Sequence, residues 1–246
     1  MYMSNIKADT IKKDNRIIKL RFIAIMAVVF GHSIILYDPC WNLYTTVNRS
    51  VFLEIIKHLI NTFQMPLFFS ISGFCFCYSL YKLKVTDYHE VIVGIIKKAK
   101  HLLVPFFVIA VFWMIPIRIL CSYSDWSFSK IFVILKKVVL GFDCGHLWFL
   151  PSLFMIFLIS YLIIPNINGN YQYVTWLLVF YIVHICADKA PNLLYLKLVA
   201  VNFYWFYLGF VINKFHIIDY LVKYRYYLTV GSGMTILLMV LLEKYL

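Results

Sequence analysis

The sequence predicts an all-α fold, a polytopic transmembrane helical bundle with about seven spanning helices plus one or two interfacial amphipathic helices. Of its 246 residues, 63% are hydrophobic and 14% are charged, with a mean hydropathy of +0.83. An ordinary soluble domain is about 45–50% apolar and about 25% charged, so this excess is too large for one soluble core. The aromatic content of 19% agrees, because Trp and Tyr collect at bilayer interfaces.

Seven stretches are long enough to be spans, since each spanning helix needs about 20 apolar residues. They are expected at 17–37, 61–81, 102–121, 146–165, 171–187, 193–212 and 226–242. Two further segments, 51–60 and 130–141, put charged residues on one side and apolar residues on the other. Both are too short to span and are better suited to the interface.

The distribution of basic residues sets the expected direction of insertion. With residues 1–16 as a cytoplasmic segment, more Lys and Arg fall on the inner segments than on the outer ones, where Lys57 is placed. The net charge of +12 is therefore interpreted as loop and headgroup charge in a cell membrane. Nucleic-acid binding is not expected, because the basic residues are not gathered on a soluble module.

Six cysteines are present, but their spacing does not indicate a metal site. Cys75 and Cys77 lie in an apolar stretch with no companion pair at zinc spacing. We interpret all six as small apolar side chains. A bridge among Cys40, Cys121 and Cys144 is the alternative.

The stretch RFIAIMAVVFGHS, residues 21–33, carries two ionisable groups in an otherwise apolar segment. Arg21 and His32 are eleven residues apart, which is three helical turns plus roughly 20°, so they share a face about 16 Å apart along the axis. Ionisable groups in a span usually face a bundle interior or a cavity and mark a site. The alternatives are an Arg21 that snorkels to headgroups and a His32 that hydrogen-bonds across helices.

Four stretches together resemble the acyltransferase-3 family of membrane acyltransferases. They are RFIAIMAVVFGHS (21–33), MPLFFSISGF (65–74), KKAKHLLVPFF (97–107) and GHLWFLPSLF (145–154), in the order that the family has. The form of the last stretch is similar to the branch of fucose 4-O-acetylases and intercellular adhesion polysaccharide acyltransferases. Lys97 and Lys100 stand where the family usually has arginines. The family fold has about ten spans, so we expect one domain over 1–246 that lacks the family's C-terminal helices.

The resemblance implies an integral membrane O-acyltransferase that moves an acyl group, expected to be acetyl, from acyl-CoA to a hydroxyl of a cell-surface or exported saccharide. His32 would remove the hydroxyl proton, which a neutral imidazole does near physiological pH, and Arg21 would meet the donor. No bound cofactor or metal is expected, and the partners would be membrane lipids, acyl-CoA and the saccharide. A flippase or transporter for a lipid-linked sugar and an inactive truncated remnant are the alternative functions.

The same resemblance implies five substrate-binding residues, and each has a plainer interpretation. For Ser72, the alternative is a small-residue packing face with Gly73. For Lys97 and Lys100, which would attract the phosphates of coenzyme A together with Lys98, it is contact with headgroups. For Trp148 and its neighbour His146, it is anchoring at the interface.

Overall fold

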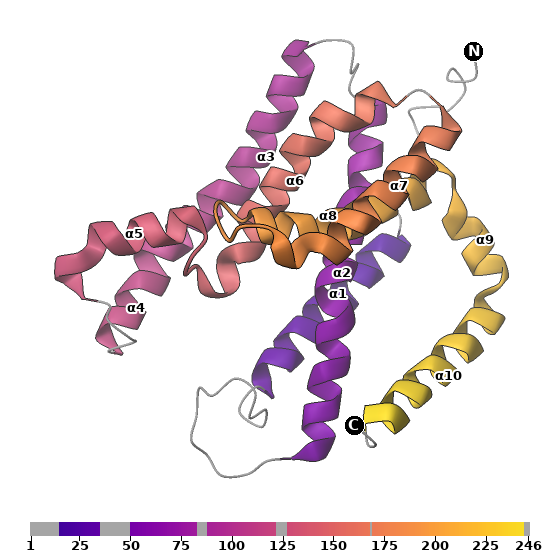
Figure 1. Ribbon diagram of the computed structural model, residues 1–246, viewed down its shortest axis with the longest axis horizontal. Helices are drawn as coiled ribbons and strands as arrows, with labels where there is room; N and C mark the ends of the chain where they lie inside the picture. Colours follow the sequence, from indigo (N-terminus) through magenta and orange to yellow (C-terminus); the bar gives the residue numbers. More distant parts are fainter. Residues whose placement is uncertain (1–14, 35–49, 83–87, 122–126, 168, 244–246) are drawn as a thin grey trace. The chain divides into compact units, whose positions relative to one another are not determined.

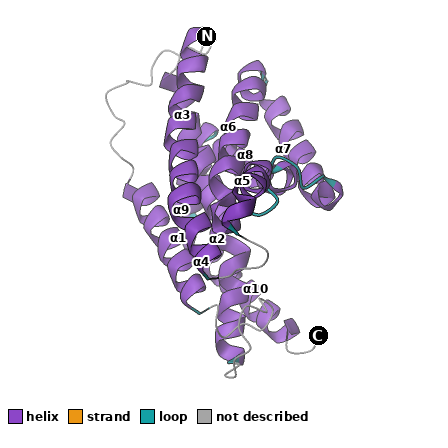
Figure 2. Ribbon diagram, turned by 90° about the vertical axis from the view of Figure 1, so that its left-hand side faces the viewer, coloured by secondary structure: helices purple, strands orange, loops and turns teal. Residues whose placement is uncertain are grey.

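The computed structural model describes residues 15–34, 50–82, 88–121, 127–167 and 169–243, and the regular structure in these ranges is helical (Figures 1 and 2). Within these ranges, four stretches of helix are long and apolar enough to cross a membrane: Val51–Tyr81, Tyr88–Leu120, Gly145–Asn166 and Leu196–Lys214. The prediction of an all-α membrane bundle is confirmed. The chain forms two compact units, Ser72–Lys214 and the combination of Met1–Ile71 with Phe215–Leu246, which are described separately.

The first unit contains α1 (Asn15–Ser33), the first part of α2 (Val51–Lys82), α9 (Ile217–Lys223) and α10 (Arg225–Glu243). The helix α1 ends at Ser33, whereas the predicted span continued to residue 37, and residues 35–37 lie outside the described ranges. Arg16 of α1 pairs with Asp219 of α9 at 3.3 Å. Both side chains are exposed, so this ion pair adds little stability.

The sequence predicts a separate interfacial helix at 51–60, but in the structure this segment is the start of the continuous helix α2. No Gly or Pro stands at the junction between this segment and the predicted span, and the helix continues through Pro66 inside that span. Its Lys57, which we had placed on an outer polar face, is only 1% exposed. The predicted amphipathic surface is therefore absent at this position.

In the second unit, a single stretch of helix is built from α3 (Tyr88–Ile109), a π-helical turn at Ala110–Met114 and α4 (Ile115–Leu120). Pro116 has no N–H to donate to the carbonyl of Phe112, which accounts for the loss of the regular α-helical hydrogen bonds here. The helix α5 (Ile131–Leu140) follows and ends at Gly141, whose φ of 85° requires no Cβ. It buries Ile134 and Val138 and exposes Lys136, so this second predicted amphipathic helix is present.

The remaining helices of this unit enclose an aromatic core. They are α6 (Phe149–Ile163), α7 (Asn170–Ile185) and α8 (Leu196–Lys214), with α3 packed along α6 and α7 along α8 (Figure 1). Phe76, fully buried on the last part of α2, lies 4.9–5.7 Å in ring-centroid distance from Phe157, Tyr161 and Phe206. Edge-to-face and tilted pairs of this kind stabilise a core beyond the area they bury.

The contact between α2 and α8 depends on a glycine. A Cβ built on Gly73 would overlap the backbone carbonyl of Phe206. About two turns further along α8, the side-chain amide of Asn213 donates to the carbonyl of Phe74 at 2.6 Å. Small residues allow helix backbones to approach closely in a membrane, so Gly73 has the packing role that one interpretation of the motif assigned to it.

We predict that Gly73→Ala destabilises the protein by about 1–3 kcal/mol, because backbone on one of the two helices must shift. The measurement is the midpoint of thermal unfolding in detergent, with Gly233→Ala as the matched control. Gly233 is also helical, and a Cβ there would meet nothing within 4 Å. Equal midpoints for the two variants would contradict the packing role.

Candidate functional site

The predicted site residues fall in both compact units. Arg21 and His32 belong to the first unit, and Ser72, Lys97, Lys100, His146 and Trp148 belong to the second. Each group is therefore considered within its own unit. The helices that position them are α1 for the first group, and α2, α3 and the 3-10 turn η6 (Gly145–Trp148) for the second.

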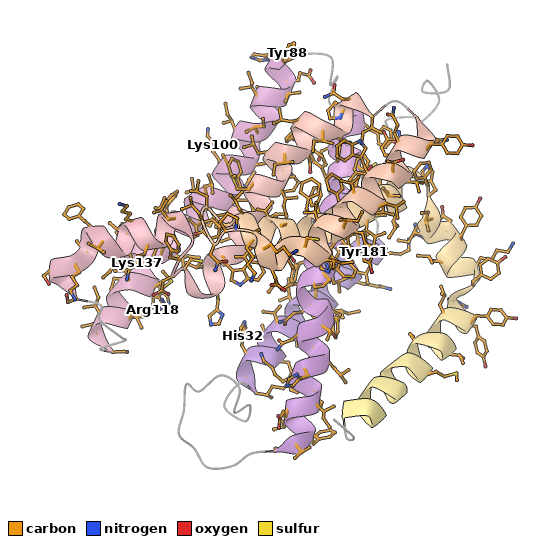
Figure 3. The ribbon with its side chains drawn as sticks, viewed as in Figure 1. His32, Tyr88, Lys100, Arg118, Lys137 and Tyr181 are labelled. Carbon is orange, nitrogen blue, oxygen red and sulfur yellow. The ribbon has the colours of Figure 1, made fainter. Side chains whose placement is uncertain are left out.

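Arg21 and His32 lie on the same uninterrupted helix, α1, so the spacing argument for a shared face applies. Arg21 is exposed, and His32 is half-buried in the last turn (Figure 3). Between them, the helix buries only Ala24 and Gly31. Those two small residues mark the side of α1 that packs inward.

Lys57 is a residue of this region that the sequence alone did not indicate as part of a site. Its ammonium group donates a 2.7 Å hydrogen bond to the carbonyl of Gly31, the residue before His32. A cation buried in an apolar helix is costly and usually has a function. The signal that could have identified it is the spacing of Lys57, Asn61 and Gln64, which places three polar groups on one side of α2.

Gln64 lies on the same side of α2 and is 7% exposed. Its Nε2 donates to Oδ1 of Asn61 at 3.0 Å. Its Oε1 has no hydrogen-bond partner among the residues that the structure describes. Buried carbonyl oxygens are nearly always paired in folded proteins, so this atom needs an explanation.

In the second unit, Lys98 has different surroundings from Lys97 and Lys100, the other two lysines of the basic run. The Nζ atom of Lys98 lies 4.2 Å from the ring centroid of Phe157 on α6, a cation–π contact between helices. Lys97 and Lys100, the two predicted to bind substrate, are both exposed, and their spacing of three residues makes them neighbours on the surface of α3. Figure 3 shows Lys100 on this helix. They are free to meet phosphates or headgroups in a way that Lys98, committed to packing, is not.

His146 and Trp148 lie in η6, directly after the ion pair of Arg118 with Asp143. The guanidinium of Arg118 donates to the Asp143 carboxylate at 2.8 Å, and the two side chains are 19% and 32% exposed. A Cβ on Gly145, whose φ is +52°, would lie 2.6 Å from Nη2 of Arg118. Arg118 lies near the outer end of the predicted span 102–121, where the sequence alone favours an interfacial charge, but in the structure it is bound to the loop that precedes His146.

Two neutral groups lie next to this loop. Burial raises the pKa of the Cys144 thiol above its ordinary value, and burial likewise raises the pKa of the Tyr195 hydroxyl. Tyr195 also donates to the carbonyl of Val138 at 2.6 Å. Both groups therefore stay protonated at neutral pH and contribute packing, not charge, to the surroundings of His146.

The cysteines and the acidic residues of the described ranges do not assemble a metal centre. Cys75, Cys77, Cys121, Cys144 and Cys186 are free thiols, so the alternative of a bridge between Cys121 and Cys144 is wrong. Cys40 lies outside the described residues. Within those residues, three or more His, Cys, Asp or Glu groups do not come together at ligand distance.

Comparison with known proteins identifies the class of this chain. The acyltransferase-3 family model, described as an acyltransferase domain, matches residues 15–243. The match includes α1 at one end and α10 at the other, so the chain belongs to this family of acyltransferases and is a membrane member of it. No curated protein and no solved structure matches the chain.

We predict that Asp143→Ala lowers stability by about 1–2 kcal/mol, because it leaves the half-buried Arg118 without its carboxylate. Asp188→Ala is the control, since Asp188 pairs with Lys197 at 2.9 Å but is 91% exposed, and its loss should cost less than about 0.5 kcal/mol. Thermal unfolding of the purified variants measures both effects. A loss at Asp143 as small as that at Asp188 would show that the Arg118 pair is an ordinary surface contact.

Proposed function

We propose that this acyltransferase moves an acetyl group from acetyl-CoA to a hydroxyl of a cell-surface or exported saccharide, with His32 as the general base. The observation that carries the proposal is the presence of Arg21 and His32 on one helix of a chain that belongs to an acyltransferase family. His32 is half-buried, as suits a base that must exclude bulk water from the reacting hydroxyl.

The proposed reaction is a direct transfer. An imidazole nitrogen of His32 takes the proton of the acceptor hydroxyl as its oxygen attacks the thioester carbonyl carbon. The tetrahedral intermediate then collapses, the C–S bond breaks, and coenzyme A leaves as a thiol with the proton returned by His32. The products are the O-acetylated saccharide and free coenzyme A, and no electron donor or acceptor is required.

The other predicted residues have proposed roles on either side of this step. Arg21, about three turns before His32, meets the donor, together with Lys97 and Lys100, whose charges complement the phosphates of coenzyme A. Ser72, His146 and Trp148 contact the acceptor. We place the N-terminus and the donor on the cytoplasmic side of the cell membrane, because the basic residues are concentrated there.

His32→Ala should lower acetyl transfer by about 10²–10⁴-fold, the usual contribution of a general base. The assay incubates membrane vesicles containing the full chain with radiolabelled acetyl-CoA and counts the label retained by the extracted saccharide. His89→Ala, which truncates an exposed histidine at the start of α3, is the control and should keep the wild-type rate.

Transfer at the wild-type rate by His32→Ala would overturn the role of this histidine. Movement of the sugar across the membrane without retained label would favour the flippase. No label in the saccharide fraction with either wild type or control would leave the acyl transfer to saccharide unsupported.

The double variant Lys97→Glu/Lys100→Glu should raise the KM for acetyl-CoA by about tenfold or more, since losing about 1.4 kcal/mol of phosphate contact gives a factor of ten. The KM for the acceptor should stay unchanged. The matched control is Lys136→Glu/Lys137→Glu, which reverses two exposed charges on α5. If both double variants have the wild-type KM for acetyl-CoA, the run on α3 contacts headgroups instead.

A further inference from the structure

A polar stripe on α2, buried at Lys57 and Gln64 and exposed at Asn61, has no role in the proposed reaction. It consists of Lys57, Asn61 and Gln64, at spacings of four and three residues, which place them on one side of the helix. Lys57 is 1% exposed and Gln64 is 7% exposed. Both face α1 within the same compact unit.

The stripe lies against the residue that precedes His32. A Cβ on Gly31 would lie 3.5 Å from Nζ of Lys57 and 3.6 Å from Oε1 of Gln64. Gly31 is followed directly by His32, and consecutive Cα atoms are about 3.8 Å apart. The stripe on α2 therefore contacts α1 one residue before the proposed base. The two distances from the Cβ are ordinary contact distances, so both polar atoms lie directly against the backbone of α1 at Gly31, where a Cβ would crowd only Ile60, at 3.1 Å from its Cγ2.

The direction of the Gln64 amide is set by its neighbour. Because Nε2 donates to Oδ1 of Asn61 at 3.0 Å, Oε1 is the end that faces α1. Among the described residues nothing donates to it. The structure therefore holds a buried hydrogen-bond acceptor in place beside Gly31 at a cost in stability, as expected where a ligand supplies the donor.

The chemistry of the stripe selects the kind of ligand. A carbonyl oxygen accepts only from N–H or O–H groups, which lipid tails lack. The ammonium of Lys57, bonded to the Gly31 carbonyl at 2.7 Å, disfavours a cationic donor at the same place. A neutral hydroxyl fits both constraints.

We infer that Gln64 Oε1 binds a hydroxyl of the acceptor, either the one that is acylated or its neighbour on the sugar, and so orients it toward His32. This inference rests on the proposed function. Lys57 is a positioning residue, which fixes the end of α1 through the Gly31 carbonyl, and Asn61 holds the amide in the receiving direction. The stripe thus belongs to the part of the site that binds the saccharide, and no contact with acyl-CoA is assigned to it.

The test is Gln64→Leu, which keeps the size of the side chain and removes the accepting oxygen. Initial rates are measured in membrane vesicles with the full chain, using radiolabelled acetyl-CoA and graded amounts of the saccharide fraction that takes up label. We expect the KM for that fraction to rise about tenfold, with the KM for acetyl-CoA unchanged. Gln64→Glu, which keeps an accepting oxygen, should restore most of the apparent affinity.

Thermal unfolding gives a second readout that a purely structural role would not produce. Gln64→Leu removes a buried, unpaired polar atom, so its midpoint should equal or exceed that of the wild type while its acceptor affinity falls. The control is Gln172→Leu, which replaces an exposed glutamine on α7 and should alter neither KM.

The outcomes separate this inference from the function on which it rests. If His32→Ala abolishes transfer but Gln64→Leu keeps the wild-type KM for the saccharide, the hydroxyl site is overturned and the function stands. If Gln64→Leu raises the KM for acetyl-CoA instead, the stripe belongs to the donor and the inference is wrong. If the wild type labels no saccharide fraction, the proposed function fails and the inference fails with it.

Discussion

The hydrogen bond from the Lys57 ammonium to the Gly31 carbonyl is the interaction on which the candidate site of the first unit depends. A helix has unpaired carbonyls in its last turns, and in apolar surroundings each needs a donor. Lys57 supplies one of them from a neighbouring helix, next to His32. It is also a buried charge that the rest of the chain must tolerate, and such charges are retained in membrane helices mainly where they serve a site.

Helical periodicity was enough to predict the shared face of Arg21 and His32, because α1 is continuous between them. It was also enough for the spans predicted at 61–81, 102–121, 146–165 and 193–212, which coincide with helices long and apolar enough to cross a membrane. It was not enough for Lys57. A lysine in a ten-residue amphipathic segment has the same local pattern whether its face meets water or another helix, and only the continuation into α2 and the contact with Gly31 decide between them.

In the second unit, the pairing of Arg118 was likewise not predictable from the sequence. Its place near the end of a predicted span suggested an interfacial charge, but Asp143 lies beyond a loop and 25 positions along the chain. Pairing across such a connection depends on how the loop folds, which hydropathy does not record. By contrast, the glycine of the SGF motif was open to two interpretations from sequence, and the close approach of α8 supports the packing one for Gly73.

The π-helical turn at Ala110–Met114 changes the direction in which the following residues point around the long helix that contains it. Arg118 is eighteen residues after Lys100, which is five full turns of a regular α-helix, so without the turn both cations would emerge on one side. The wider turn rotates everything after it by roughly a quarter of a revolution. Lys100 therefore stays exposed while Arg118 faces Asp143. A single helix with this turn therefore directs Lys100 and Arg118 to different sides.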